Sequence, residues 1–418
     1  MELQLKNSKL FKGEIFSAGA WMILATIFTG VLGYAFQILI GRLLSIQEFG
    51  AFGAFFAIIS FLTVPKEVLS NQVARYCSNQ VANGHTTLIG EIYIFGITVL
   101  LTICALGSSL IVFFGDDLLQ KITVGSTFFN LNLAALICVT MLMAFNQAIL
   151  QGLKKFKAIC LLLSTGMGLK FLACSILLSL GFGLGGAIGG VTIAATCTLI
   201  LSFVFLWLYL PIRFGMQSAS FGTRKGVWKL FFSNFVFTVC TQTDVILVKV
   251  IFGSQNAGIF LAASVIAKTV LFVPGALNLA LFPLSAHSKA EGRLDKRMLY
   301  QSLAFTLISG FFCTAVFFFF ADDLISLAFS ARYQEAAFIL KIYGFCLLPV
   351  TLSLVAEKYF LARDEAYFAS PLLLLLGVSL LIGINLGVSV ETLIKIYGVS
   401  SAAAFAVGMI RATVFSAK

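Results

Sequence analysis

The chain has 418 residues, of which 60% are hydrophobic and only 11% are charged. A soluble domain is typically about half apolar and a quarter charged, so one soluble core would not hide this much apolar surface. A net charge of +11 would suit a nucleic-acid binder if the protein were soluble. Here the charges fall in short segments between long apolar runs, which favours an integral membrane protein without a nucleic-acid partner.

Apolar runs of roughly 18 to 25 residues recur along the chain, and each is long enough to cross about 30 Å of hydrocarbon as an α-helix. The first run is too long for the apolar part of a signal peptide, so we interpret it as a span. The expected fold is all-α and integral to the membrane. In chain order, the twelve predicted spans are 16–40, 51–72, 91–114, 126–150, 159–180, 187–210, 229–252, 259–283, 301–320, 337–355, 367–390 and 393–410.

Lysines and arginines are distributed unevenly between the two sides of the membrane. With the N-terminus in the cytoplasm, most of the 28 fall in inner segments. The outer segments hold Arg42, Lys121, Lys249, Arg332, Lys341 and Lys395. This bias follows the positive-inside rule and predicts an even number of spans with both termini in the cytoplasm.

The chain contains an internal duplication. A stretch that begins at Gly33 aligns without gaps with one that begins at Thr241. Other landmarks recur in the same order. The paired positions include Gln47/Gln255, Gly50/Gly258, Pro65/Pro274 and the FF-x-DDL runs at Phe113 and Phe319. We predict two six-helix bundles, residues 1–211 and 212–418, related by an axis along the membrane normal around a central cavity. The paired prolines are expected bending points.

Three charged residues are predicted to lie at membrane depth, where charge is costly and marks candidate functional sites. Lys170 falls near the middle of the fifth span, Asp244 in the seventh and Lys268 in the eighth. Asp244 and Lys268 are expected at similar depth on consecutive antiparallel helices, so they can pair. Two interpretations stay open: a buried structural ion pair, or cationic groups that face a cavity and bind an anionic substrate.

Arg42 and Lys249 fall near the outer ends of the first and seventh spans. Snorkelling to the headgroups is the favoured account of both, and substrate binding is the alternative. Amides within spans suit either sugar hydroxyls or interhelical hydrogen bonds. No Ser/His/Asp set, metal-ligand spacing or Walker motif is visible, and the nine cysteines form no CxxC pair. The predicted protein is therefore not an enzyme and needs no cofactor.

The stretch GRLLSIQEFGAFGAFFAI, from Gly41, resembles the end of the first span and the start of the second in the polysaccharide transporter family. That family belongs to the multidrug/oligosaccharidyl-lipid/polysaccharide exporter superfamily and flips lipid-linked oligosaccharides, including O-antigen units. TDVILVKVIFGSQNAGIFLAASVIAKTVLFVPGALNLALFP, from Thr243, is similar to the start of the family's second half. QAILQGLKKFKA, from Gln147, is similar to the inner end of its fourth span.

The resemblance implies two six-helix bundles in a V around a cationic cavity. It implies that a polyprenyl-diphosphate-linked oligosaccharide passes from the cytoplasmic to the outer leaflet of a bacterial inner membrane by alternating access. Asp244 matches the family's aspartate in the seventh span. The candidate cavity residues are Lys170, Lys268, Asp244, Arg42 and Lys249. The coupling ion stays open between H⁺ and Na⁺. Membrane lipids, a polysaccharide polymerase and glycosyltransferases are the expected partners.

Three rival functions remain. An ion-coupled drug or small-molecule antiporter of the same superfamily would prefer an acidic cavity, whereas Asp244 is the only clear acid well inside a predicted span. A membrane-bound sugar polymerase would carry a large outer loop, and the predicted loops are short. A scaffold or receptor would not need two similar halves with buried charges.

Overall fold

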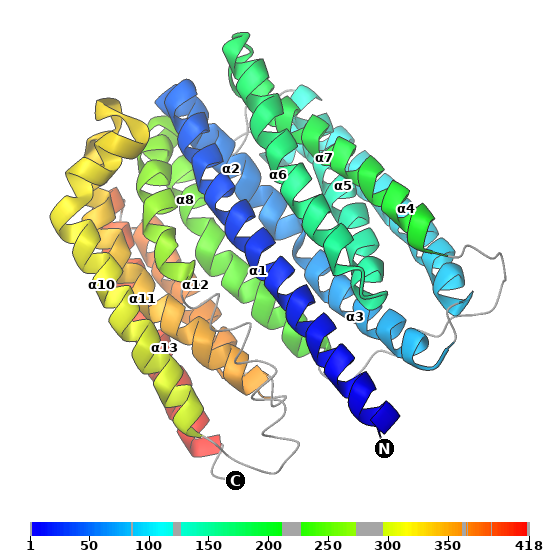
Figure 1. Cartoon of the computed structure of the whole chain (residues 1–418). Helices are drawn as coiled ribbons and strands as arrows, with labels where there is room; N and C mark the ends of the chain where they lie inside the picture. The colour runs from blue at the N-terminus through cyan, green and yellow to red at the C-terminus, as the bar shows by residue number, and fades with distance from the viewer. Residues whose placement is uncertain are drawn as a thin grey trace. The chain divides into compact units, whose positions relative to one another are not determined.

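The computed structural model describes residues 2–84, 87–119, 127–210, 227–272, 296–361, 365, 367–385 and 387–415 (Figure 1). Within these residues every regular element is a helix. The α-helices are α1 (Glu2–Leu43), α2 (Ile46–Leu62), α3 (Val64–Ala82), α4 (Thr87–Leu119), α5 (Thr127–Gly152), α6 (Phe156–Ser179), α7 (Gly183–Tyr209), α8 (Val227–Ala267), α10 (Lys296–Phe329), α11 (Glu335–Leu361), α12 (Ala369–Asn385) and α13 (Val390–Phe415). The short 3₁₀ helices are η1 (Lys268–Leu271) and η2 (Ala331–Tyr333).

The helices confirm the all-α membrane fold. Each predicted span overlaps a helix, and two of them overlap the two arms of α8, which is broken at Gly253 (φ 85°, ψ 174°). By length and composition, nine helices in the described part can cross a membrane, or ten if α2 and α3 form one bent span. The second arm of α8 is described only to residue 272, and Pro274 and Pro283 lie outside the described residues.

Contacts divide the chain into two compact units. The first comprises Met1–Leu43 and Pro65–Gly222, and the second comprises Leu44–Val64 and Thr223–Lys418. Helix α2 therefore packs within the second unit, although its sequence falls in the first predicted half. The helical structure is interrupted at Thr63, between α2 and α3. This residue lies one position before Val64, where the first segment of the second unit ends. The superposition of residues 1–211 on 212–418 stays a prediction.

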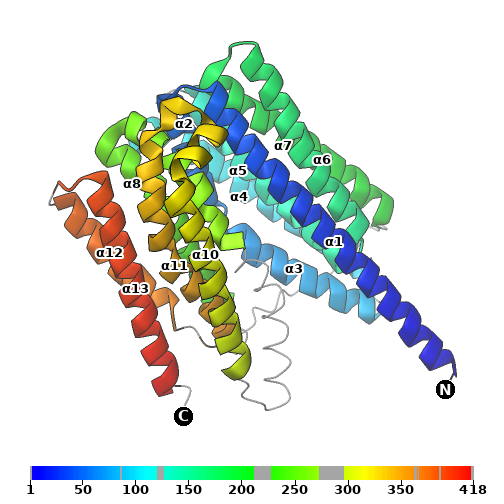
Figure 2. The same cartoon turned by 60° about the vertical axis from the view of Figure 1, so that its left-hand side comes forward.

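In the first unit, α5 contacts α4 and α7, and α6 contacts α1 and α7 (Figure 2). The rings of Tyr93 and Phe145 stack with centroids 6.0 Å apart in its apolar core. Amides within the helices form interhelical hydrogen bonds. Asn146 Nδ2 donates to Ser202 Oγ at 2.8 Å, and a second such bond joins α7 to α5. Interhelical bonding, one of the two interpretations open for such amides, therefore accounts for part of this set.

In the second unit, α11 contacts α8, α10 and α13, and α12 contacts α8 and α13. The Glu48 side chain accepts hydrogen bonds from the N–H and hydroxyl of Ser45, so a capping box starts α2. Helix α2 then packs closely along the second arm of α8. A Cβ atom on Gly50 would lie 2.6 Å from Gly258 N, and one on Gly258 would overlap the carbonyl of Ile46. The two glycines paired by the duplication therefore lie against each other, backbone to backbone.

Candidate functional site in the second unit

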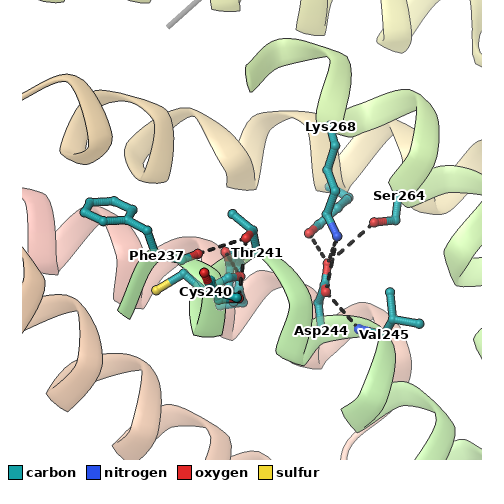
Figure 3. Close-up of polar contacts among 10 residues, drawn as sticks. Phe237, Cys240, Thr241, Asp244, Val245, Ser264 and Lys268 are labelled. Atoms are coloured by element: carbon teal, nitrogen blue, oxygen red, sulfur yellow. Dashed lines mark hydrogen bonds and ion pairs between the residues drawn. The ribbon is translucent and has the colours of Figure 1, made fainter. Parts of the chain in front are cut away.

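Asp244 and Lys268 are brought together by the break in α8. Gly253 has a positive φ that glycine adopts without the steric strain of other residues, so the chain can turn there. The second arm then returns alongside the first. Figure 3 shows Ser264 and Lys268 on one arm directed towards Asp244 on the other. At Lys268 the α-helix gives way to the 3₁₀ helix η1.

Both oxygens of the Asp244 carboxylate are engaged. Lys268 Nζ lies 3.0 Å from Oδ2 and 3.3 Å from Oδ1. The N–H of Val245 donates to Oδ1 at 2.9 Å. The hydroxyls of Tyr343, on α11, and Ser264 both donate to Oδ2, the latter at 3.5 Å. The pairing of Asp244 with Lys268 that the sequence predicted is thus present, and two hydroxyl donors complete it.

The two side chains of this ion pair differ in how much of their surface is exposed. The Asp244 side chain is 5% exposed, whereas that of Lys268 is 18% exposed. A buried carboxylate without a counter-charge is costly, so Asp244 depends on its donors. Lys268 retains an exposed part through which a second anionic group can approach it.

A small pocket lies beside Asp244 within the second unit. Side chains from α8, α11, α12 and α13 line it, and most of them are aliphatic or aromatic. The hydroxyl of Tyr397 donates to the carbonyl of Cys240 at 2.8 Å, and its ring centroid lies 6.2 Å from that of Tyr343. Asp244 therefore borders a mostly apolar pocket whose other polar side chains are two tyrosines, a thiol and the Thr243 hydroxyl.

The other predicted cations are placed differently. Lys249 lies further along the first arm of α8, is 6% exposed and has no hydrogen-bond partner for Nζ among the described residues. It is thus enclosed by protein, which differs from the snorkelling that the sequence favoured. In the first unit, the Lys170 ammonium on α6 lies 4.2 Å from the ring centroid of Phe36, a cation–π contact. Arg42 is exposed in the last turn of α1.

Sequence reasoning missed two of the three side chains that bind Asp244. Ser264 precedes Lys268 by four residues, a spacing that places both on one helix face. Its position near Asp244 could therefore have been predicted from the sequence. Tyr343 lies in α11, far from Asp244 in sequence, and only the packing of α11 on α8 brings it there.

A second buried acid was also missed because α11 extends past its predicted end to Leu361. Glu357 is fully buried, and its Oε2 accepts hydrogen bonds from the N–H groups of Tyr367 and Phe368 at 3.2 and 3.0 Å. These groups precede α12, so the carboxylate binds the backbone that leads into that helix. Next to it, Lys358 Nζ donates to Asn234 Oδ1 at 2.9 Å. Glu357 thus holds α12 to α11.

Within the described residues, no group of three or more His, Cys, Asp or Glu side chains could hold a metal ion. The donors around Asp244 are an ammonium, two hydroxyls and a backbone N–H, which suit a carboxylate rather than a metal cofactor.

Comparison with known proteins identifies the family. Residues 13–338 match the family described as "Polysaccharide biosynthesis protein". The chain belongs to this family. No curated protein matches the chain.

The chain has the fold of several solved transporters. It is 14% identical to an inward-facing multidrug resistance MATE family transporter of the MOP superfamily, with a TM-score of 0.74 over 93% of this chain and 96% of that one. It is 14% identical to lipid II flippase MurJ in an inward closed conformation, with a TM-score of 0.68 over 93% and 87%. A MOP superfamily transporter from Pyrococcus furiosus is also 14% identical, with a TM-score of 0.66 over 96% and 95%. The protein is a multi-pass membrane protein that shares the fold of these transporters.

Proposed function

We propose that this protein flips a polyprenyl-diphosphate-linked oligosaccharide from the cytoplasmic to the outer leaflet of a bacterial inner membrane by alternating access. In this role it carries out no covalent chemistry. Its partners are the lipid-linked oligosaccharide, the surrounding lipids, and the glycosyltransferases and polymerase that make and consume the cargo. The two bundles that alternate are the predicted halves, residues 1–211 and 212–418, and an ion gradient, of H⁺ or Na⁺, couples to the cycle through Asp244.

The observation that carries the proposal is the Lys268 ammonium, held within the second unit yet 18% exposed. A diphosphate diester bears about two negative charges, and a charge-assisted hydrogen bond from a buried ammonium stabilises such a group where water is scarce. Lys170, which has a cation–π partner in the first unit, is a second candidate for the same task. The family match adds that the cargo belongs to polysaccharide biosynthesis, and one solved relative is described as a lipid II flippase.

Antiport of a drug or small molecule is the second candidate function, because the similar structure with a TM-score of 0.74 is described as a multidrug resistance transporter. A cationic drug would need an acidic site. Both buried acids described above are already engaged: Asp244 by Lys268, and Glu357 by the backbone before α12. Because both carboxylates already have partners within the protein, the site favours an anionic cargo over a cationic one.

The test measures export of glycan in a strain that lacks its own flippase and makes the lipid-linked oligosaccharide. Lys268→Ala should reduce surface glycan per folded molecule at least about tenfold, since one charge-assisted hydrogen bond is lost. Lys268→Arg should retain part of the export because the charge remains. Lys341→Ala is the matched control, because Lys341 also pairs with an aspartate, Asp322, at 2.9 Å but in an exposed position. Drug resistance that depends on Lys268, with no export of glycan by the wild type, would favour the antiporter.

The proposed orientation has its own test. Reporter fusions after Lys157 and after Lys296 should be cytoplasmic, and fusions near Asp117 and Gln255 should be on the outer side. A consistent inversion would contradict export from the cytoplasm as proposed.

A further inference from the structure

Helix α3 carries a polar stripe on its exposed side. Glu67, Asn71, Arg75 and Asn79 follow one another at intervals of four residues, and all four are exposed. Because residues at this spacing are neighbours on a helix surface, they form one continuous stripe, which we call the α3 stripe. Within the part of the chain that the structure describes, the side chains of Asn71, Arg75 and Asn79 form no hydrogen bond. Their polar groups are therefore available to a ligand.

The opposite side of α3 fixes the level of the stripe within the first unit. The hydroxyl of Ser70 donates to the carbonyl of Ala144, on α5, at 3.1 Å. Further along, the buried Cys77 packs so closely on Gly152, the last residue of α5, that a Cβ atom there would lie 2.3 Å from Cys77 Cβ. Helix α3 thus runs alongside the last third of α5. The predicted orientation places this end of α5 at the cytoplasmic side of the membrane.

The α3 stripe differs from a helix face that contacts acyl chains. On α4 the residues that are exposed at the same spacing, Phe95, Val99 and Ile103, are apolar, as expected of a face in contact with lipid. A carboxylate, a guanidinium and two amides would be costly in hydrocarbon. The α3 stripe is therefore suited to water and polar headgroups. In the cytoplasmic leaflet, the sugars of a lipid-linked oligosaccharide lie in the same polar zone.

The composition of the stripe matches a neutral ligand that is rich in hydroxyls. Glu67 and Arg75 carry opposite charges, so the stripe has no net charge. An anionic ligand would meet the carboxylate of Glu67, and a cationic ligand would meet the guanidinium of Arg75. Sugar hydroxyls can accept hydrogen bonds from the guanidinium and the amide N–H groups, and they can donate to the carboxylate and the amide oxygens.

We propose that the α3 stripe binds the sugar chain of the cargo on the cytoplasmic side, while Lys268 binds the diphosphate. The inference rests on the proposed function and adds a determinant of glycan length. At 1.5 Å per residue the stripe is about 18 Å long from Glu67 to Asn79, enough for several sugar rings in line. The protein should therefore select a lipid-linked oligosaccharide over a carrier that bears only its first sugar.

The test uses the full chain in lipid nanodiscs and two probes, a short-chain polyprenyl diphosphate that bears a single N-acetylglucosamine and the same carrier with a neutral tetrasaccharide of N-acetylglucosamine. Calorimetry gives the two dissociation constants. The wild type should bind the tetrasaccharide probe about tenfold more tightly or better, since several hydrogen bonds to the added sugars each contribute. The double variant Asn71→Ala with Asn79→Ala should lose most of this preference.

The double variant should still bind the single-sugar probe like the wild type, which shows that it is folded. Asn256→Ala is the matched control, because it removes an exposed amide from α8 and should keep the preference. Lys268→Ala should weaken the binding of both probes by a similar factor. A wild type without preference, or a double variant that keeps it, would overturn this proposal and leave the flippase function standing. If the wild type binds neither probe, the proposed function falls, and this inference falls with it.

Discussion

Two lysines on the two arms of α8, Lys249 and Lys268, differ in their surroundings. The side chain of Lys268 is 18% exposed and forms an ion pair with Asp244. Lys249 is buried, and its Nζ has no hydrogen-bond partner in the part of the chain that the structure describes. Both were selected in the sequence for the same reason, a cation in or near a predicted span. The comparison teaches that the predicted depth of a charged residue in the membrane selects it as a candidate for a functional site. The helix face on which the residue lies decides whether it has a counter-charge and whether a ligand can reach it.

The largest effect on stability should come from replacing Asp244, the acid that pairs with Lys268. Asp244→Leu leaves the Lys268 ammonium without its counter-charge and should lower the free energy of unfolding by about 3 kcal/mol. Thermal unfolding of the purified protein in detergent measures this. In the double variant, Asp244→Leu with Lys268→Met, most of the stability should return because no unpaired charge remains.

The same double variant separates stability from transport. If the pair serves only to hold the helices together, the double variant should export glycan normally per folded molecule. We expect stable protein with little export, and normal export would contradict a transport role for Lys268.

A smaller loss of stability should follow from removing one of the two hydroxyls that donate to Asp244. Tyr343→Phe removes the O–H that donates to Asp244 Oδ2 and leaves the ring in place. A hydrogen bond to a charged group contributes about 2 kcal/mol, so the melting temperature should fall by less than in Asp244→Leu. An unchanged melting temperature would show that the remaining donors satisfy the carboxylate.

The smallest effect, and one of opposite sign, should come from Lys249. Lys249→Met keeps a side chain of similar length and removes a buried charge, so it should raise stability by about 1 kcal/mol. A loss of stability in the same melting experiment would mean that Lys249 has a partner after all, and the contrast between the two lysines would disappear.

The sequence predicted what depends on local pattern. The lengths of the apolar runs located the spans, and the turn between the seventh and eighth of them falls at Gly253, within α8. The similar depths of Asp244 and Lys268 predicted their contact. These features follow from hydropathy, helical rise and chain order, all of which are properties of neighbouring residues.

The rest depends on packing between helices that are distant in sequence. Tyr343 reaches Asp244 only because α11 packs on α8. Lys249 was expected to reach the headgroups, but the neighbouring helices enclose it. Glu357 was missed because α11 continues for two turns past the predicted boundary, and helix ends are the least certain part of such a prediction. The roles of the five candidate site residues stay predictions.

The contact between Gly50 and Gly258 limits which second mutations can compensate for a substitution at either glycine. A larger residue at one side of a packed contact is often tolerated when its partner becomes smaller. Here each glycine meets main-chain atoms: Gly50 faces the backbone of Gly258, and Gly258 faces the carbonyl of Ile46. Neither side has a side chain left to shorten, so Gly50→Ala or Gly258→Ala should have no suppressor at the opposite glycine. A screen for revertants should recover either true reversion or changes that move a whole helix.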